Sequence, residues 1–378
     1  MTPTQILALI ALLVIVAAIA YWFGRSGQAG GAGRTPSGPA PIPSEPWARP
    51  VGEATEMAGA PKKPAAKDLA RPVTTSTAPT KSPQAPPKSA HPIAAYGVTS
   101  WGYQLQKLDV GRAAGSPFDL LVIDYAKDGS DDTALSPAEL ERLKRKPDGG
   151  RRIVLAYLSI GEAESYRSYW QAQWKRNKPG WLLGENPEWE ENYSVCFWEP
   201  EWQQIMCGAR DSRLDLILAA GFDGVYLDKC DVYEDLQQHF KKVAAARSDI
   251  EGDMVQFISR LATQAKSRNP DFLVVMQNAE GLLEKPALRR VIDGIAKEEL
   301  VFGVDSPEKK NSKDDFEYSR DALALMKREG KLVLVVEYLN TPAKIKEAAE
   351  ACAQNGFVLY VSAKNRELDK LNFMTLEA

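Results

Sequence analysis

Residues 222–228 read Phe222-Asp-Gly-Val-Tyr-Leu-Asp228, a short β-rich run that ends in a carboxylate. Two other runs share this outline, Phe118-Asp-Leu-Leu-Val-Ile-Asp124 and Ile292-Asp-Gly-Ile-Ala-Lys-Glu298. Each opens with an apolar residue and an Asp, and a second carboxylate follows five residues after that Asp. A strand that ends in an acid can deliver a carboxylate to the rim of a barrel. We therefore expect chemistry performed by acids. We expect the first Asp of each run to lie at the opposite, stabilising end.

Eight runs of this kind are expected to form strands. Most are continuous apolar stretches, such as Leu332-Val-Leu-Val-Val336, which is typical of parallel strands buried on both faces. Helical patterns fill the gaps, and Ser136 with Pro137 and Glu139 predicts one helix start. The predicted strands are residues 96–101, 119–124, 153–158, 223–228, 272–277, 292–297, 332–337 and 357–361.

This alternation predicts an α/β fold, a (β/α)8 TIM barrel, because eight strand–helix units fit the length of that fold. The alternative is an open, doubly wound sheet. No G-x-G-x-x-G follows the first predicted strand, which argues against a dinucleotide site. The longest connection, residues 161–200, is rich in Trp and Tyr, and such long connections are often functional.

The first 92 residues are expected to lie outside the barrel. Residues 6–23 form an uncharged apolar run of 18 residues, so residues 1–24 are interpreted as a transmembrane anchor. A cleaved signal peptide is the alternative, because Ala18-Ile-Ala20 has the form of a cleavage site. Residues 25–92 hold 14 of the 25 prolines, which predicts a disordered linker. The barrel is then expected over residues 93–378.

Charge and residue types narrow the function. Residues 93–378 carry 38 Lys and Arg against 46 Asp and Glu, a formal charge of −8. This balance suits a cationic ligand better than a nucleic acid, with ordinary solubility as the alternative explanation. The four cysteines, at 196, 207, 230 and 352, form no C-x-x-C pair, and we expect no metal and no cofactor. His91 and His239 are the only histidines, which argues against a Ser-His-Asp hydrolase.

Side-chain alternation selects among the acids at the strand ends. Asp228 shares a face with Gly224 and Tyr226, where small and inward-facing residues suit a barrel interior. By the same parity Glu298 is expected to point inward, while Glu299 points toward the helices. Hydrolysis of a glycoside needs only two carboxyl groups, one protonated and one ionised. Asp228 and Glu298 are two of several strand-end acids from which such a pair can come, together with Asp124, Glu162 and Glu337.

Four stretches then resemble glycoside hydrolase family 114, which comprises endo-α-1,4-polygalactosaminidase-like TIM barrels. They are Tyr157-Leu-Ser-Ile-Gly-Glu-Ala-Glu-Ser-Tyr-Arg-Ser-Tyr-Trp170, Phe197-Trp-Glu-Pro-Glu-Trp202, Gly221-Phe-Asp-Gly-Val-Tyr-Leu-Asp228 and Val336-Glu-Tyr-Leu339. The resemblance implies cleavage inside a galactosamine-containing polysaccharide, with catalytic carboxylates at Asp228 and Glu298. Many members have Asn directly after the carboxylate that corresponds to Asp228, whereas this chain has Lys229 there. A cation at that position would favour an ionised Asp228, or it would indicate an altered substrate.

We accordingly expect Asp228 to be the nucleophile or base and Glu298 the proton donor. Flat aromatic rings and strand-end polar groups are expected to bind the sugar. The expected substrate contacts are Trp101, Asp124, Tyr125, Tyr157, Glu162, Arg167, Trp198, Lys229, Asn278, Glu337 and Tyr338.

The expected partners are the polysaccharide and, through residues 6–23, a membrane. No nucleic acid and no obligate protein partner are expected. Arg25 weakly favours a cytoplasmic barrel by the positive-inside rule, but the function favours a periplasmic or extracellular one. A non-catalytic polysaccharide-binding or scaffold barrel at the cell envelope is the alternative function.

Overall fold

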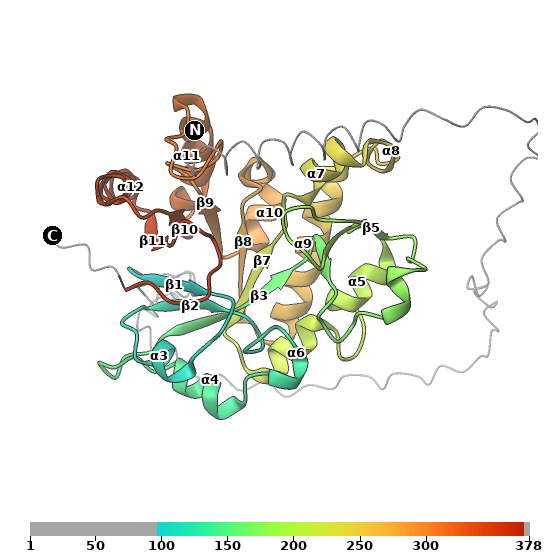
Figure 1. Cartoon of the computed structure of the whole chain (residues 1–378), viewed down its shortest axis with the longest axis horizontal. Helices are drawn as coiled ribbons and strands as arrows, with labels where there is room; N and C mark the ends of the chain where they lie inside the picture. Colours follow the sequence, from blue (N-terminus) through green and yellow to red (C-terminus); the bar gives the residue numbers. More distant parts are fainter. Residues whose placement is uncertain (1–96, 374–378) are drawn as a thin grey trace, which may run out of the picture. The chain divides into compact units, whose positions relative to one another are not determined.

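The structure is a computed structural model that describes residues 97–373 (Figure 1). At its centre lies one sheet of eight parallel strands whose spatial order follows the sequence. This order has no reversal, which is the topology of a barrel and excludes the doubly wound alternative. The predicted α/β barrel is thereby confirmed. The strands are β1 (Trp101–Gln104), β2 (Leu120–Ile123), β3 (Ile153–Ser159), β7 (Gly224–Asp228), β8 (Leu273–Gln277), β9 (Gly294–Glu298), β10 (Leu332–Tyr338) and β11 (Val358–Ser362).

Alternation along the strands builds two apolar layers. On β8, Leu273 and Val275 point into an interior cluster to which all eight strands contribute. Val274 and Met276 of the same strand pack in the outer cluster, between the sheet and the helices. Both layers consist of fully or almost fully buried side chains. This double burial explains why the strands read as continuous apolar runs in the sequence.

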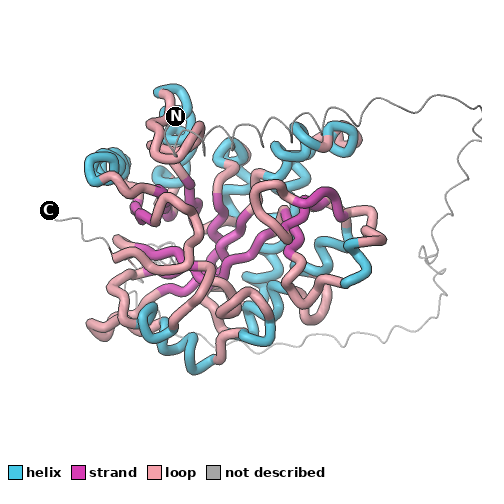
Figure 2. Tube along the Cα trace, viewed as in Figure 1, coloured by secondary structure: helices cyan, strands magenta, loops and turns pink. Residues whose placement is uncertain are grey.

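Helices surround the strands, as the cyan and magenta segments of Figure 2 show. Within residues 97–373, β11 is not followed by a helix, so the eighth strand–helix unit is incomplete there. Three 3-10 helices are η1 (Asp131–Thr133), η2 (Ala172–Lys175) and η3 (Glu280–Glu284). The α-helices are α3 (Val110–Ala114), α4 (Pro137–Leu143), α5 (Pro200–Cys207), α6 (Arg213–Ala220), α7 (Val232–His239), α8 (Lys241–Ala244), α9 (Ile250–Arg268), α10 (Pro286–Val291), α11 (Lys313–Arg328) and α12 (Pro342–Asn355).

Local signals place the helix ends. The capping box predicted from Ser136 and Glu139 is present at the start of α4. Gly221 ends α6 with a left-handed backbone, φ 93°, which a residue with a Cβ adopts only at a cost. β7 starts only three residues after Gly221, so this turn connects α6 directly to the strand that carries Asp228.

The long connection after β3 folds into a small antiparallel sheet. Its strands are β4 (Glu162–Glu164), β5 (Leu182–Glu185) and β6 (Asn192–Val195), in the order β4-β6-β5. Gly184 of β5 packs close to the ring of Phe240, which joins α7 to α8. The connection expected to be a long loop is therefore an ordered insertion beside the barrel, and Figure 1 labels its β5 near those two helices.

Three aspartates fasten the N-terminal ends of the strands. Asp223, before β7, accepts the Val154 N–H of β3 at 2.9 Å. Asp293, before β9, accepts the Val274 N–H of β8 at 2.6 Å. Asp119, before β2, accepts the Ser100 N–H at 3.1 Å, just ahead of β1. The three recurring residues thus bind the start of the preceding strand, in agreement with the stabilising end assigned to them.

The contact with Asp119 also fixes where the first strand begins. Strand β1 starts at Trp101, whereas residues 96–101 were predicted to form it. The backbone N–H and the hydroxyl of Thr99 also donate to Asp119, at 3.0 and 2.8 Å. Thr99 therefore bonds to this side chain and not to the backbone of a neighbouring strand. Trp101 is consequently the first strand residue and not the last.

The strands β1 and β11 lie at the two ends of the hydrogen-bonded order, where they form the seam of the barrel. The Trp101 indole N–H donates to the Val358 carbonyl at 2.9 Å across this seam. Beyond β11, the Leu368 carbonyl accepts the N–H groups of Leu105 and Gln106 at 2.9 and 3.2 Å. Side chains and the following segment, rather than a ladder, therefore bridge the seam.

Several expectations fall on residues 1–96, which lie outside the described residues. They are the anchor or signal peptide over residues 1–24, its membrane run at residues 6–23 and the linker over residues 25–92. Among residues 97–373, no helix has the length and apolar character needed to cross a membrane.

We expect Asp223→Ala to lower the free energy of unfolding by about 1–3 kcal/mol, because the buried Val154 N–H loses its acceptor. Urea unfolding followed by circular dichroism would measure this change. Asp271→Ala is the matched control, since Asp271 is exposed just ahead of β8. Equal stabilities of the two variants would contradict the fastening role of Asp223.

Candidate active site

A cleft of about 950 Å³ opens at the C-terminal ends of the strands. Inward-facing side chains near the C-terminal ends of six strands form its floor. These residues are Tyr103 of β1, Tyr157 of β3, Asp228 of β7, Gln277 of β8, Glu298 of β9 and Tyr338 of β10. The two predicted carboxylates therefore line one cleft.

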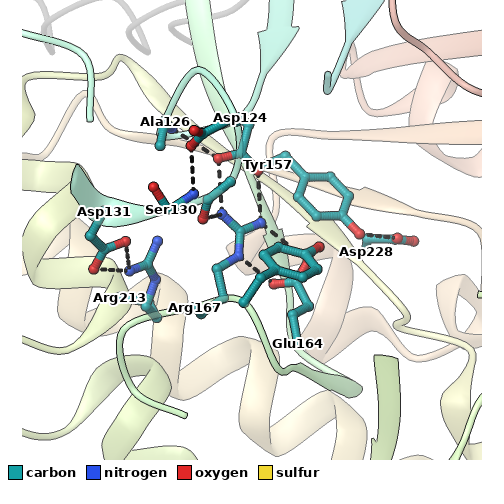
Figure 3. A network of polar contacts seen from close by, with 12 residues as sticks. Asp124, Ala126, Ser130, Asp131, Tyr157, Glu164, Arg167, Arg213 and Asp228 are labelled. Carbon is teal, nitrogen blue, oxygen red and sulfur yellow. Dashed lines mark hydrogen bonds and ion pairs between the residues drawn. The ribbon is translucent and has the colours of Figure 1, made fainter. Parts of the chain in front are cut away.

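Asp228 is held by two donors. The Tyr157 hydroxyl donates to its Oδ2 at 2.6 Å, a contact drawn in Figure 3, and the Lys229 N–H donates to Oδ1 at 2.7 Å. Burial and the negative charge of Glu298 raise the pKa of Asp228 to about 7, although the Tyr157 bond lowers it. At neutral pH this carboxyl group is therefore poised between its two protonation states.

Glu298 is surrounded by neutral donors. The amides of Gln277 and Asn278 donate to its Oε2, the latter at 3.1 Å, and the Tyr338 hydroxyl donates to Oε1. The Asn278 side-chain oxygen in turn accepts the Glu298 N–H at 3.1 Å. Residues at the ends of β8 and β10 thus orient this carboxylate, which accepts a hydrogen bond from each of the three side chains.

Lys229 does not pair with Asp228. Its ammonium group bonds to Asp235 at 2.9 Å and lies 3.3 Å from Glu162. The charge of Lys229 lowers the pKa of Asp228 less than burial and Glu298 raise it. Lys229 thus lowers the pKa of Asp228 in the expected direction, but other carboxylates bind its ammonium group and the net shift is upward.

Three strand ends turn in the same way. Lys229, Asn278 and Glu299 directly follow β7, β8 and β9, and their φ angles are 56°, 53° and 54°. Left-handed backbone is strained for residues with a Cβ, and such strain gathers at functional sites. Strand alternation stops at this turn, so all three side chains also line the cleft. Glu299 was expected to face the helices, but instead it pairs with Arg366 at the rim.

Arg167 forms the buried wall shown in Figure 3. Its guanidinium binds Asp124 through two bonds of 2.9 and 2.7 Å and Glu164 through bonds of 2.8 and 3.1 Å, and it donates to the Gly129 carbonyl. Asp124 also accepts the Ala126 N–H at 2.8 Å. Asp124 and Arg167 thus line the cleft, as expected of substrate contacts, but they largely satisfy one another.

The cleft is strongly acidic. Thirteen carboxyl groups line it, against four Lys and Arg side chains, those of Lys107, Arg167, Lys229 and Arg366. Burial raises the pKa of Asp231 to about 6 despite the nearby charge of Lys229, so this carboxyl group is still mostly ionised at neutral pH. A cavity with this surplus attracts cations and repels anions.

Four predicted contacts lie away from the cleft. Trp101 is buried in the barrel core, because β1 begins there instead of ending there. Tyr125 packs near Phe222 and beneath the Arg213 guanidinium, and Trp198 packs against Phe197. Glu337 is buried on the outer face of β10, because its neighbour Tyr338 takes the inward position.

The cleft also contains residues outside the list of expected substrate contacts. Tyr103 and Tyr166 reach the cleft, and so do Trp189 and Arg366. Alternation from Trp101 would have found Tyr103 if the strand had been placed correctly. No local pattern indicates Arg366, because it reaches the site through a pairing with Glu299, 67 residues earlier.

Comparison with known proteins places this site in context. The model of glycoside-hydrolase family GH114 matches residues 76–377. An uncharacterized protein of Methanocaldococcus jannaschii is 38% identical over 283 residues, covering 72% of this chain and 78% of that protein. Another, from Deinococcus radiodurans, is 37% identical over 296 residues, covering 76% and 87%.

A solved structure has a similar fold. The glycoside hydrolase domain of PelA from Pseudomonas aeruginosa superposes with a TM-score of 0.53 at 19% identity, covering 72% of this chain and 97% of that one. At this identity the likeness concerns the fold.

The burial of the Glu337 side chain on the outer face of β10 can be tested through its effect on stability. It accepts the N–H groups of Val301 and Phe302 at 2.7 and 3.3 Å, yet burial raises its pKa to about 8. An unfolded Glu titrates near about 4.3. Between these two pH values the folded protein holds a proton that the unfolded chain has lost, so stability falls as pH rises.

We expect Glu337→Gln to flatten this decline by about 1 kcal/mol per pH unit between pH 5 and 8. Urea unfolding at several pH values would give the slopes. Glu350→Gln, at an exposed position on α12, is the control. If the slope for Glu337→Gln matched that of the unchanged protein, the buried, protonated state of Glu337 would be refuted.

Proposed function

Because this chain belongs to glycoside-hydrolase family GH114, we propose that it cleaves a galactosamine-containing polysaccharide at internal linkages. Family membership makes it a glycoside hydrolase. The polymer, the endo mode of attack and the residue roles are parts of the proposal. The observation that carries them is the pair Asp228 and Glu298 on the floor of one acidic cleft.

The proposed reaction needs one proton on this pair. A carboxylic acid donates it to the leaving glycosidic oxygen as the bond from that oxygen to the anomeric carbon breaks. The ionised carboxylate attacks the anomeric carbon directly or deprotonates the water that does. Water finally supplies the hydroxyl group on that carbon and the proton that restores the acid.

The electrostatics of the cleft favour the proton on Asp228, whose pKa is raised to about 7. Glu298, which accepts three neutral side-chain donors, is then assigned the role of nucleophile or base. This distribution reverses the roles that Lys229 suggests from sequence alone.

The acidic lining supports a cationic amino sugar. Free amino groups of a deacetylated galactosamine unit are protonated at neutral pH, and thirteen carboxyl groups face the cleft. Glu162 and Asp235, which hold the Lys229 ammonium group, offer geometry that a sugar ammonium group could also use. A polysaccharide substrate also favours a barrel outside the cytoplasm, held to a membrane by residues 6–23.

We expect the purified protein to release reducing ends from partly deacetylated α-1,4-polygalactosamine. Asp228→Asn and Glu298→Gln should each lower the rate by about 10³-fold, since each removes a group that transfers a proton or stabilises charge. Asp321→Asn, at an exposed position on α11, is the matched control. Undiminished cleavage in both site variants would overturn the assignment. Binding without any cleavage by the unchanged protein would favour a binding module.

The pH profile tests the proton on Asp228. We expect kcat/KM to fall as pH rises through about 7, because the protonated form is lost there. Tyr157→Phe removes a hydrogen bond that lowers the pKa of Asp228, so the alkaline limb should move to higher pH. An alkaline limb that moved down or stayed in place would argue that another group controls it.

A further inference from the structure

Two aromatic side chains remain exposed in the cleft. Trp189 is 44% exposed and Tyr166 is 40% exposed, and both belong to the insertion that follows β3. Two other tryptophans of the same insertion are buried, Trp174 at 8% and Trp181 at 3% exposed. The insertion therefore has an apolar core of its own, and it leaves these two rings outside that core.

Trp189 sits on an ordered turn between β5 and β6. The Asn186 N–H bonds to the Asn192 carbonyl at 2.7 Å, and the Trp189 carbonyl accepts the Asn192 N–H at 3.3 Å. The Glu185 carboxylate accepts the Glu191 N–H at 2.8 Å. The backbone that carries the exposed indole is thus fixed by several hydrogen bonds, which preorganises the ring for a ligand.

This turn is connected to the catalytic floor. The Asn186 amide donates to Glu162 at 2.8 Å, and Glu162 lies 3.3 Å from the ammonium group of Lys229, the residue after Asp228. The position of the Trp189 turn is therefore tied to the strand that carries one member of the catalytic pair.

Tyr166 is fixed in a comparable way on the wall formed by Arg167. Its hydroxyl donates to Glu164 at 2.6 Å. The Arg167 guanidinium lies 5.0 Å from the centre of the ring, close enough for a cation–π contact. Side chains that pack on one part of the ring leave the rest of it exposed to the cleft.

We propose that Trp189 and Tyr166 are binding platforms for sugar units away from the bond that is cleaved. This inference rests on the proposed function. The C–H face of a pyranose ring is apolar and packs on an aromatic ring. Displacement of water from the two apolar faces then favours binding. Glu185, Glu188 and Glu191 also line the cleft around Trp189 and suit hydroxyl or ammonium groups. The platforms would make binding depend on the length of the polymer.

The test uses the Glu298→Gln protein, so that ligands bind without turnover. Its probes are α-1,4-linked galactosamine oligomers of two and of six units, titrated by calorimetry. Adding Trp189→Ala should weaken binding of the six-unit probe about tenfold, which corresponds to about 1.4 kcal/mol. The two-unit probe should bind equally to both proteins, because it occupies the catalytic floor alone.

Two further variants sharpen this test. Trp189→Phe keeps a ring and should retain most of the six-unit affinity, whereas Trp189→Ala should not. Tyr318→Ala is the matched control, since Tyr318 is 59% exposed but does not line the cleft. Circular dichroism of each variant shows whether it is folded. Quenching of tryptophan fluorescence by the six-unit probe should shrink in Trp189→Phe.

The outcomes distinguish a failure of the aromatic platforms from a failure of the proposed hydrolase function. Cleavage of the polymer with unchanged six-unit affinity in Trp189→Ala would overturn the platform and leave the hydrolase intact. Equal losses for both probes would also overturn it. Binding of a neutral polymer that depends on Trp189, with none of an amino-sugar polymer, would support the platform and refute the substrate. The absence of binding to any polymer would overturn both.

Discussion

Side-chain alternation along eight parallel strands decides which residues can reach the cleft. It places Asp228 and Glu298 on one floor with Tyr157, Gln277 and Tyr338. It also sends Glu337 to the outer layer, one residue away from Tyr338. The constraint ends where the strands end. There, left-handed residues turn Lys229, Asn278 and Glu299 into the same cleft. The site therefore contains more polar groups than a regular barrel rim would present.

This density of polar groups has an electrostatic consequence. Carboxylates in a shared, poorly solvated space raise one another's pKa unless donors or cations compensate. Around Asp124 and Glu164 the compensation comes from Arg167, whose guanidinium is saturated by them. Around Asp228 the donors are a phenol and one backbone N–H, so its pKa remains raised. The carboxylates of the wall are thus bound to a cation, whereas Asp228 on the floor has only neutral donors and a raised pKa.

Much of this arrangement could be predicted from the sequence. Long apolar runs identified the strands β2, β3 and β7 to β11, and parity brought Asp228 and Glu298 together. Errors arose where a local signal was weak. The first strand was placed a few residues early, which moved Trp101 from the core to the rim. The strands β4, β5 and β6 span only three or four residues each, too short for a period to be visible. Contacts such as Arg366 with Glu299 depend on tertiary structure alone.

The seam between β1 and β11 has a consequence for the chain's behaviour at high concentration. Where a barrel is not closed by a ladder, its edge strands expose backbone groups that can pair with another copy. Here the Trp101 indole N–H donates to the Val358 carbonyl, and the Leu368 carbonyl accepts the N–H groups of Leu105 and Gln106. The segment after the last strand thus covers positions where a second molecule would attach. A barrel built this way is guarded against edge-to-edge aggregation by its own C-terminal segment.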